Sequence, residues 1–231
     1  MELVFVLVEP AVPENIGASA RALKTMGFGQ LRLVNTLRHQ EKQARILAHG
    51  AGDILTSAKV YDDLPAALAD VDLAIATSAK ARHHWRDLLA PAQIRDLIAG
   101  KRGALKRVSV VFGCEESGLS NDQLACCDLL SSIPLAVTYP SLNLSQAVML
   151  YAYELSPLQQ TARDAGSSQA DLGQYRALKQ KLAERLPALS YGEDSTLYRW
   201  AMEKIGRLGQ KDIGFLHALC DKLALNDIRG K

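Results

Sequence analysis

Small polar residues, glycines and one arginine gather in three short segments of this sequence: PENIGASAR (13–21), FGCEESGL (112–119) and PSLNLSQA (140–147). Glycine and small residues let main-chain N–H and C=O groups come close to a ligand, which suits a flat polar ring such as adenine. An arginine such as Arg21 can stabilise negative charge but, being permanently protonated, cannot easily act as a base. These residue types therefore predict a flat, nucleotide-like ligand held by main chain.

The glycines also have a plainer explanation. Gly113 and Gly118 could simply form a turn and the entry to a helix. The sequence contains no G-x-G-x-x-G fingerprint and no P-loop, which disfavours a dinucleotide-dependent dehydrogenase and an NTPase. What favours a ligand site is repetition, because several apolar runs end in small residues that expose the main chain.

The segments that must position these residues alternate regularly up to about residue 157. Continuous apolar runs alternate with helical patterns, which is typical of a parallel sheet covered by helices on both faces. The sequence therefore predicts an α/β fold, whose ligands bind outside the carboxyl ends of the strands. The predicted strands are 2–9, 30–35, 71–78 and 107–113, with a strand or strand end at 129–137 that runs into Pro134. The predicted helices are 14–27, 39–48, 62–70, 91–99, 120–127 and 143–156.

The helix predicted at 143–156 is apolar on all sides behind its first turn. Asn143 followed by Gln146 predicts a capping box at its start. A helix without a polar face must be buried on more than one side. It could be a central core helix, or it could also line a dimer interface through Met149 or Tyr151.

The composition is that of an ordinary globular protein, with 231 residues, 48% of them hydrophobic and 23% charged. The first residues carry acids instead of a basic region, and no apolar run reaches the roughly 18 residues of a membrane span. A cytoplasmic protein is therefore expected. The net charge of +2 does not by itself indicate nucleic-acid binding.

One segment is strongly basic, because residues 80–107 contain eight lysines and arginines against two aspartates. His83, His84 and Trp85 lie among them. A basic loop with an aromatic residue suits a phosphate backbone and an unstacked base, but a solvated surface loop explains it equally well. Adjacent His83 and His84 point in different directions, so no metal site is predicted.

The three segments occur in order at domain-scale spacing, and they resemble the motifs of the SPOUT (SpoU-type) RNA ribose methyltransferases, in particular the TrmJ-like and LasT-like tRNA/rRNA methyltransferases. The resemblance covers residues 1–157, and Cys114 and Glu116 depart from the family pattern. The matching residues are Asn15, Gly17, Ala20 and Arg21 in the first motif, Phe112, Gly113, Glu115, Gly118 and Leu119 in the second, and Ile133, Pro134, Ser141, Leu142, Asn143 and Ala147 in the third.

The resemblance implies properties that periodicity does not reveal. The parallel-sheet domain would end in a deep trefoil knot, a rare feature among folds, and would form a homodimer. S-adenosylmethionine would be the cofactor, held in the knot. Its binding residues would be Thr77, Ser78, Ala79, Gly113, Ile133, Pro140, Ser141, Leu142 and Asn143.

The resemblance also implies catalytic roles for Arg21, Asn15 and Glu115. On a helical wheel Arg21 lies about 140° from the stripe of Ile16 and Leu23, so it is not packed inward. A solvated helix face would explain such an arginine, whereas catalysis would place its guanidinium beside a ribose 2′-hydroxyl or a phosphate. Asn15 and Glu115 would orient loops, although Glu115 could equally cap the following helix. RNA contacts are expected at Arg21, Lys80, Arg82 and Arg86.

The character of the chain changes after about residue 157. Residues 158–170 are polar and glycine-containing, which indicates a linker between the domain at 1–157 and a helical extension at 171–231. The extension could dock RNA or could stabilise the dimer.

Together these features predict an S-adenosylmethionine-dependent RNA ribose 2′-O-methyltransferase acting on tRNA, with rRNA as a second candidate substrate. The alternatives are a knotted RNA-binding protein without methyl transfer and, less well supported without a phosphate loop, a small-molecule nucleotide-binding enzyme.

Overall fold

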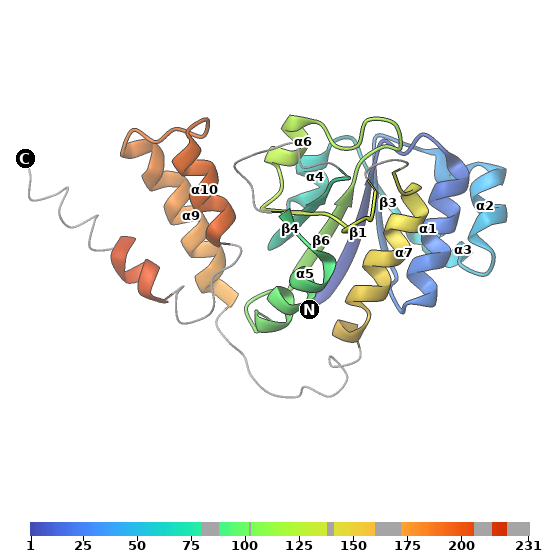
Figure 1. Cartoon of the computed structure of the whole chain (residues 1–231), viewed down its shortest axis with the longest axis horizontal. Coiled ribbons are helices and arrows are strands. Elements are labelled where there is room, and N and C mark those ends of the chain that lie inside the picture. The colour runs from blue at the N-terminus through green and yellow to red at the C-terminus, as the bar shows by residue number, and fades with distance from the viewer. Residues whose placement is uncertain (80–87, 102, 138–140, 160–171, 206–213, 221–231) are drawn as a thin grey trace, which may run out of the picture.

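A computed structural model describes residues 1–79, 88–101, 103–137, 141–159, 172–205 and 214–220 of the chain (Figure 1). The strands are β1 (Glu2–Val8), β2 (Gln30–Val34), β3 (Lys59–Tyr61), β4 (Leu73–Thr77), β5 (Leu88–Leu89), β6 (Arg107–Phe112) and β7 (Leu129–Ser131). The helices are α1 (Pro13–Thr25), η1 (Arg38–Gln40), α2 (Lys42–Ala48), α3 (Gly52–Ser57), α4 (Leu64–Leu68), α5 (Pro91–Gly100), α6 (Asn121–Ala125), α7 (Leu144–Leu155), α9 (Leu172–Ala188) and α10 (Thr196–Ile205).

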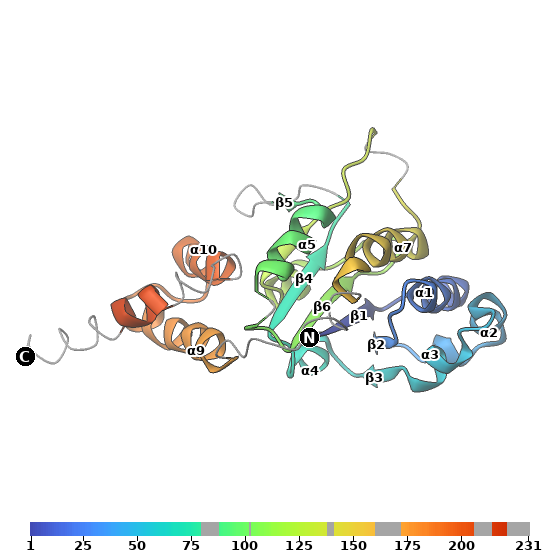
Figure 2. The ribbon, with the colours of Figure 1, turned by 90° about the horizontal axis from the view of Figure 1, so that it is seen from below.

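The strands form one seven-stranded sheet in the order β3-β2-β1-β6-β4-β7-β5, and all their pairings are parallel. Figure 2 shows α1, α5 and α7 on one side of the sheet and α4 on the other. Alternate residues of β1 enter the two hydrophobic clusters, with Phe5 and Leu7 in one and Val6 in the other. The predicted α/β fold is therefore confirmed, and its central strands are mostly apolar because both faces are covered.

Gly17 of the first motif serves helix packing. A Cβ built on Gly17 would lie 2.0 Å from the main-chain oxygen of Ala44 in α2. Only glycine lets α1 approach α2 this closely, and the two helices pack extensively. This packing fixes the direction of the helix that carries Asn15 and Arg21.

The segment 129–137 was predicted as a strand or strand end that runs into Pro134, and β7 ends before this proline, at Ser131. Pro134 has no N–H to give to a ladder, so the chain leaves the sheet after β7. Residues 132–137 continue outside regular structure, and part of this segment forms a wall of the cavity described below. Three short elements, α3, β3 and β5, were not predicted from the sequence. Each has only two to six residues, which is too few to show a clear periodicity.

The helical extension contacts the domain at the amino ends of β4 and β7. Arg176 of α9 pairs with Asp72 immediately before β4, and Lys179 pairs with Asp128 immediately before β7. Both aspartates are buried and also accept main-chain N–H groups of the sheet region. In Figure 1, α9 and α10 accordingly lie beside the β4 side of the sheet. The extension thus docks at the amino ends of the strands, on the side of the sheet opposite their carboxyl ends.

Two predictions about chain path fall largely outside the described residues. The knot depends on the route through 138–140, and the linker falls mainly on 160–171; both stay predictions. No helix in the described part of the chain is both long and apolar enough to span a bilayer.

Candidate cofactor pocket and active site

A cavity of about 310 Å³ opens at the carboxyl ends of β4, β6 and β7. This is where ligands of parallel sheets bind, and the volume is at the lower end of the range for ligand pockets. Its lining comes from four separate segments of the chain. They contribute Thr77, Ser78 and Ala79; Phe112 to Leu119, with Leu124; Ile133 and Leu135; and Ser141, Leu142, Leu144, Ala147 and Tyr151.

The structure brings most of the predicted cofactor residues together around this cavity. Pro140 lies outside the described residues, and Asn143 is not among the lining residues. The predicted residues that do line it are Thr77, Ser78, Ala79, Gly113, Ile133, Ser141 and Leu142.

The loop after β6 folds back on itself and forms one wall. Gly118 N–H donates to the carbonyl of Cys114 at 2.9 Å, and Gly118 has a left-handed φ of 69°. A Cβ built on Gly113 would lie 2.1 Å from the carbonyl carbon of Gly118 and 2.3 Å from the nitrogen of Leu119. Glycine at 113 is therefore required by the closure of the loop itself, before any ligand is considered.

The Glu115 carboxylate ties this loop to the start of α1. It accepts hydrogen bonds from the N–H groups of Ala11 (2.8 Å) and Val12 (3.3 Å) and from Asn15 Nδ2 (2.7 Å). The alternative, that Glu115 caps the next helix, is wrong, because Ser120 and Gln123 form the capping box of α6. Glu115 lies where it can hold two loops in register, as expected of an orienting residue.

Asn15 extends this connection to the third motif. Its Oδ1 accepts a hydrogen bond from Asn143 Nδ2 at 2.8 Å. Asn143 Oδ1 in turn accepts from the N–H of Ser145, and Gln146 Oε1 accepts from the N–H of Asn143. This confirms the predicted capping box, and it commits the Asn143 side chain to α7 and Asn15 instead of the cavity.

Arg21 lies apart from this network. It is exposed on α1, about 9 Å along the helix axis from Asn15, and it does not line the cavity. Within the described part of the chain, its guanidinium forms no hydrogen bond or ion pair, whereas Lys24, one turn further on, pairs with Asp53 at 2.8 Å. The Arg21 charge is thus available to an anionic ligand.

The charge of the cavity distinguishes between ligands. No lining side chain among the described residues is basic, whereas Glu115 and Glu116 are acidic. The Ser117 hydroxyl, 3.1 Å from the Cys114 sulfur, lowers the pKa of that thiol. A nucleoside polyphosphate would be repelled. S-adenosylmethionine carries a sulfonium and an ammonium against one carboxylate, so the residues present fit it.

The structure describes only part of the basic segment at 80–107 that was expected to contact RNA. Lys80, Arg82 and Arg86 lie outside the described residues, as do His83, His84 and Trp85. Arg95 pairs with Asp96 and Glu154, Arg107 pairs with Glu2 and Asp70, and Lys101 is buried with its Nζ 3.2 Å from the Ile205 carbonyl oxygen. These three cations have structural roles, so they do not form the predicted RNA surface.

Tyr151 is a lining residue for which the sequence left two positions open, the core or a dimer interface. It is 1% exposed and belongs to the core beneath the cavity, so its side chain does not form an outer face of α7. Its neighbours on the other side of α7, Leu150 and Tyr153, are 42% and 64% exposed. A helical wheel places Leu150 and Tyr153 on a shared face opposite Tyr151, but the apolar character of every side hid which face is internal.

Two family models match the chain. The SpoU rRNA Methylase family matches residues 2–153, and the C-terminal domain of the tRNA/rRNA methyltransferase LasT matches residues 172–226.

Individual proteins match as well. An uncharacterized tRNA/rRNA methyltransferase, LasT of Escherichia coli (strain K12), is 40% identical over 227 residues, covering 98% of this chain and 99% of the relative. The tRNA (cytidine/uridine-2′-O-)-methyltransferase TrmJ of Sodalis glossinidius is 42% identical over 150 residues, covering 65% of this chain and 58% of the relative. The crystal structure of TrmJ from Z. mobilis ZM4 matches with a TM-score of 0.67 at 26% identity, covering 97% of this chain and all of that chain.

Proposed function

The chain belongs to the SpoU rRNA methylase family, and from this premise we propose that it is an S-adenosylmethionine-dependent ribose 2′-O-methyltransferase acting on tRNA in the cytoplasm. The observation that carries the proposal is the cavity at the strand ends, where the second and third motifs meet around a lining without basic side chains among the described residues. Asn15 of the first motif is hydrogen-bonded to both of these motifs. The choice of tRNA over rRNA rests on the similarity to TrmJ, which is described as a tRNA (cytidine/uridine-2′-O-)-methyltransferase.

The residues of the chain divide the work between binding and alignment. When bound, S-adenosylmethionine supplies an electrophilic methyl group. The main chain of 77–79 and of the 113–119 loop supplies donors and acceptors for a flat ring, and Leu135 and Leu142 supply apolar contact. Glu115 and Asn15 hold the loop before α1 against the cavity, so that substrate and cofactor meet in a fixed geometry.

Arg21 is proposed to act on the RNA. A ribose hydroxyl becomes more negative as it attacks a methyl group, and a guanidinium beside it or beside the neighbouring phosphate stabilises that charge. Its exposure and its lack of a partner in the described structure leave it free for this task. The intact connection from Glu115 through Asn15 to Asn143 favours an active enzyme over a knotted RNA-binding protein without methyl transfer.

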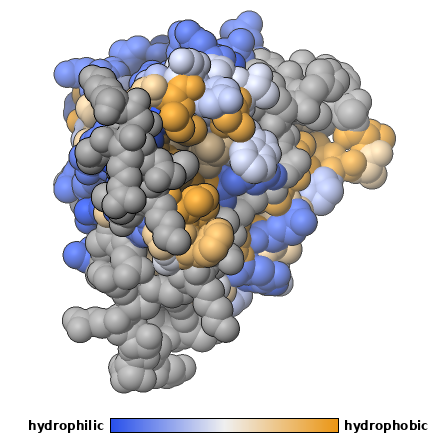
Figure 3. All heavy atoms as spheres, turned by 90° about the vertical axis from the view of Figure 1, so that its left-hand side faces the viewer, coloured by the Kyte–Doolittle hydropathy of each residue, from blue (hydrophilic) through white to orange (hydrophobic). Residues whose placement is uncertain are grey.

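The domain at 1–157 is proposed to contain the whole cofactor site, with the helical extension at 171–231 as a second unit. On the face that carries the extension, hydrophobic side chains lie exposed among hydrophilic ones (Figure 3). Trp200, 49% exposed, lies near Lys204, an aromatic and cation pair that suits stacking on an RNA base. The extension is therefore proposed to contact RNA away from the cofactor cavity.

Thermal melting tests the cofactor. S-adenosylmethionine at 100 times its Kd should add about 2.7 kcal/mol to the free energy of unfolding. ATP, which shares the adenosine but carries phosphates, should produce no shift in melting temperature, because the described lining has no cation to receive them. A shift with ATP and none with S-adenosylmethionine would contradict the proposal. Transfer of labelled methyl groups to tRNA, followed by mass mapping of ribose methylation, then tests the reaction.

The protein is also proposed to be a homodimer that buries the outer face of α7. Leu150→Glu together with Tyr153→Glu should produce monomers, since two carboxylates would be desolvated in the interface. Val60→Glu, which places the same charge on an exposed residue of the edge strand β3, should leave the mass unchanged. Light scattering at micromolar concentration measures the mass, and a monomeric wild-type protein would contradict the proposal.

A further inference from the structure

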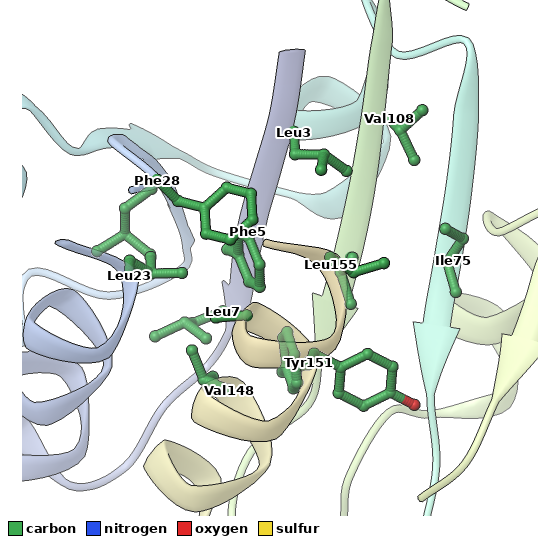
Figure 4. Packing of buried hydrophobic residues seen from close by; sticks show 14 of the residues in the cluster. Leu3, Phe5, Leu7, Leu23, Phe28, Ile75, Val108, Val148, Tyr151 and Leu155 are labelled. Atoms are coloured by element: carbon green, nitrogen blue, oxygen red, sulfur yellow. The ribbon is translucent and has the colours of Figure 1, made fainter. Parts of the chain in front are cut away.

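Tyr151 makes a polar contact in the middle of an apolar cluster. Its ring lines the cavity and meets Phe112 edge-on, with ring centroids 5.4 Å apart. Figure 4 shows the ring projecting from α7 with the hydroxyl oxygen at its far end, pointing away from the labelled aliphatic side chains. This hydroxyl lies 2.7 Å from Ser131 Oγ, to which it donates.

Ser131 is a junction for the strands that border the cavity. It is the last residue of β7 and is fully buried. Its Oγ donates to the carbonyl of Leu89 in β5 at 2.7 Å, and its own carbonyl accepts from the N–H of Ser78, just beyond β4, at 2.9 Å. At these bonds the segments that follow β4 and β7 leave the sheet and become walls of the cavity, at 77–79 and at 133–135. The position of these walls therefore depends on Ser131.

We propose that the Tyr151 hydroxyl is a positioning group for the cofactor: by fixing Ser131, it fixes the two main-chain walls between which S-adenosylmethionine binds. The inference rests on the proposed function, and it adds a residue outside the three motifs to the site. The hydroxyl is bonded to Ser131 and is not placed at the reacting groups, so it acts on cofactor affinity and not on the chemical step. Burial raises the pKa of Tyr151, which keeps the hydroxyl protonated and able to donate.

Tyr151→Phe is the direct test, because it deletes one oxygen and keeps the ring that packs on Phe112. Calorimetry should show S-adenosylmethionine binding about fivefold to tenfold more weakly, as expected for one hydrogen bond. The KM for the cofactor should rise by the same factor, while kcat at saturation stays within twofold. Ser131→Ala removes the same bond from the other side. Ser131→Ala also deletes the bond to the Leu89 carbonyl, so it should weaken binding at least as much as Tyr151→Phe. The double variant should bind the cofactor no more weakly than Ser131→Ala alone, because Tyr151→Phe then has no further bond to remove.

Tyr191→Phe is the control, since it removes a hydroxyl from an exposed tyrosine of the helical extension, outside both the cavity and the proposed dimer interface on α7. Its affinity should equal that of the wild type. If Tyr151→Phe and Ser131→Ala lower the melting temperature but bind the cofactor as the wild type does, the hydroxyl serves the core alone and this inference fails while the proposed function stands. If the wild-type protein itself does not bind S-adenosylmethionine, the proposed function fails and this inference fails with it.

Discussion

Arg21→Ala should lower kcat for methyl transfer by on the order of 10²–10³-fold, the usual cost of removing one group that stabilises a developing oxyanion. Affinity for S-adenosylmethionine should stay within twofold, because Arg21 does not line the cavity. The fold should also survive, since the side chain is exposed and forms no ion pair within the described structure. Single-turnover methylation of tRNA measures the rate, and calorimetry measures the affinity.

Two further variants separate chemistry from general charge. Arg21→Lys keeps the positive charge but loses the planar fork of donors, so it should restore only part of the rate. Lys24→Ala removes a cation from the next turn of α1 and should leave turnover nearly unchanged, since Lys24 is already paired with Asp53. Normal turnover by Arg21→Ala would remove this residue from the mechanism, and equal losses in both alanine variants would indicate nonspecific attraction of RNA.

The parallel sheet could be predicted because local sequence is enough to specify it. Each central strand, such as β1 or β6, is apolar along most of its length, since both of its faces are covered. The rule that ligands bind at the carboxyl ends of such strands then predicts where the cavity lies. The capping box at Asn143 was likewise predictable, because its partners lie within three residues.

What could not be predicted depends on contacts between distant segments. Glu115 and Asn15 are 100 residues apart, and nothing in either motif indicates that their side chains meet at 2.7 Å. Lys101 belongs to a basic run, and only the packed structure shows it buried beside the Ile205 carbonyl. Tyr151 belongs to a helix that is apolar all round, so periodicity could not separate its inner from its outer face.

At Gly113 the sequence and the structure give different physical reasons why a side chain should impair cofactor binding. From the sequence, a side chain at 113 would be expected to intrude on the cofactor. In the structure it meets the protein first, because a Cβ there would lie 2.1 Å from the carbonyl carbon of Gly118 and 2.5 Å from its oxygen. Both are backbone atoms, so the loop would have to open. Opening it would move Glu115, and with it the loop before α1 that Glu115 holds.

Gly113→Ala should therefore weaken S-adenosylmethionine binding by on the order of 100-fold or more, since a shift of about 1 Å in a wall of the binding site removes well-aligned contacts. It should also lower the free energy of unfolding by about 1–3 kcal/mol through overpacking. Gly27→Ala is the matched control outside the cavity. Gly27 has a left-handed φ of 83°, so alanine there is strained by about 1–2 kcal/mol, and Gly27 does not line the cavity. The two variants should thus lose similar stability in chemical denaturation, while Gly27→Ala keeps cofactor affinity within about threefold, which calorimetry measures. Normal affinity in Gly113→Ala would place the cofactor elsewhere, and equal loss of affinity in both variants would mean that binding follows the stability of the fold instead of the position of the wall.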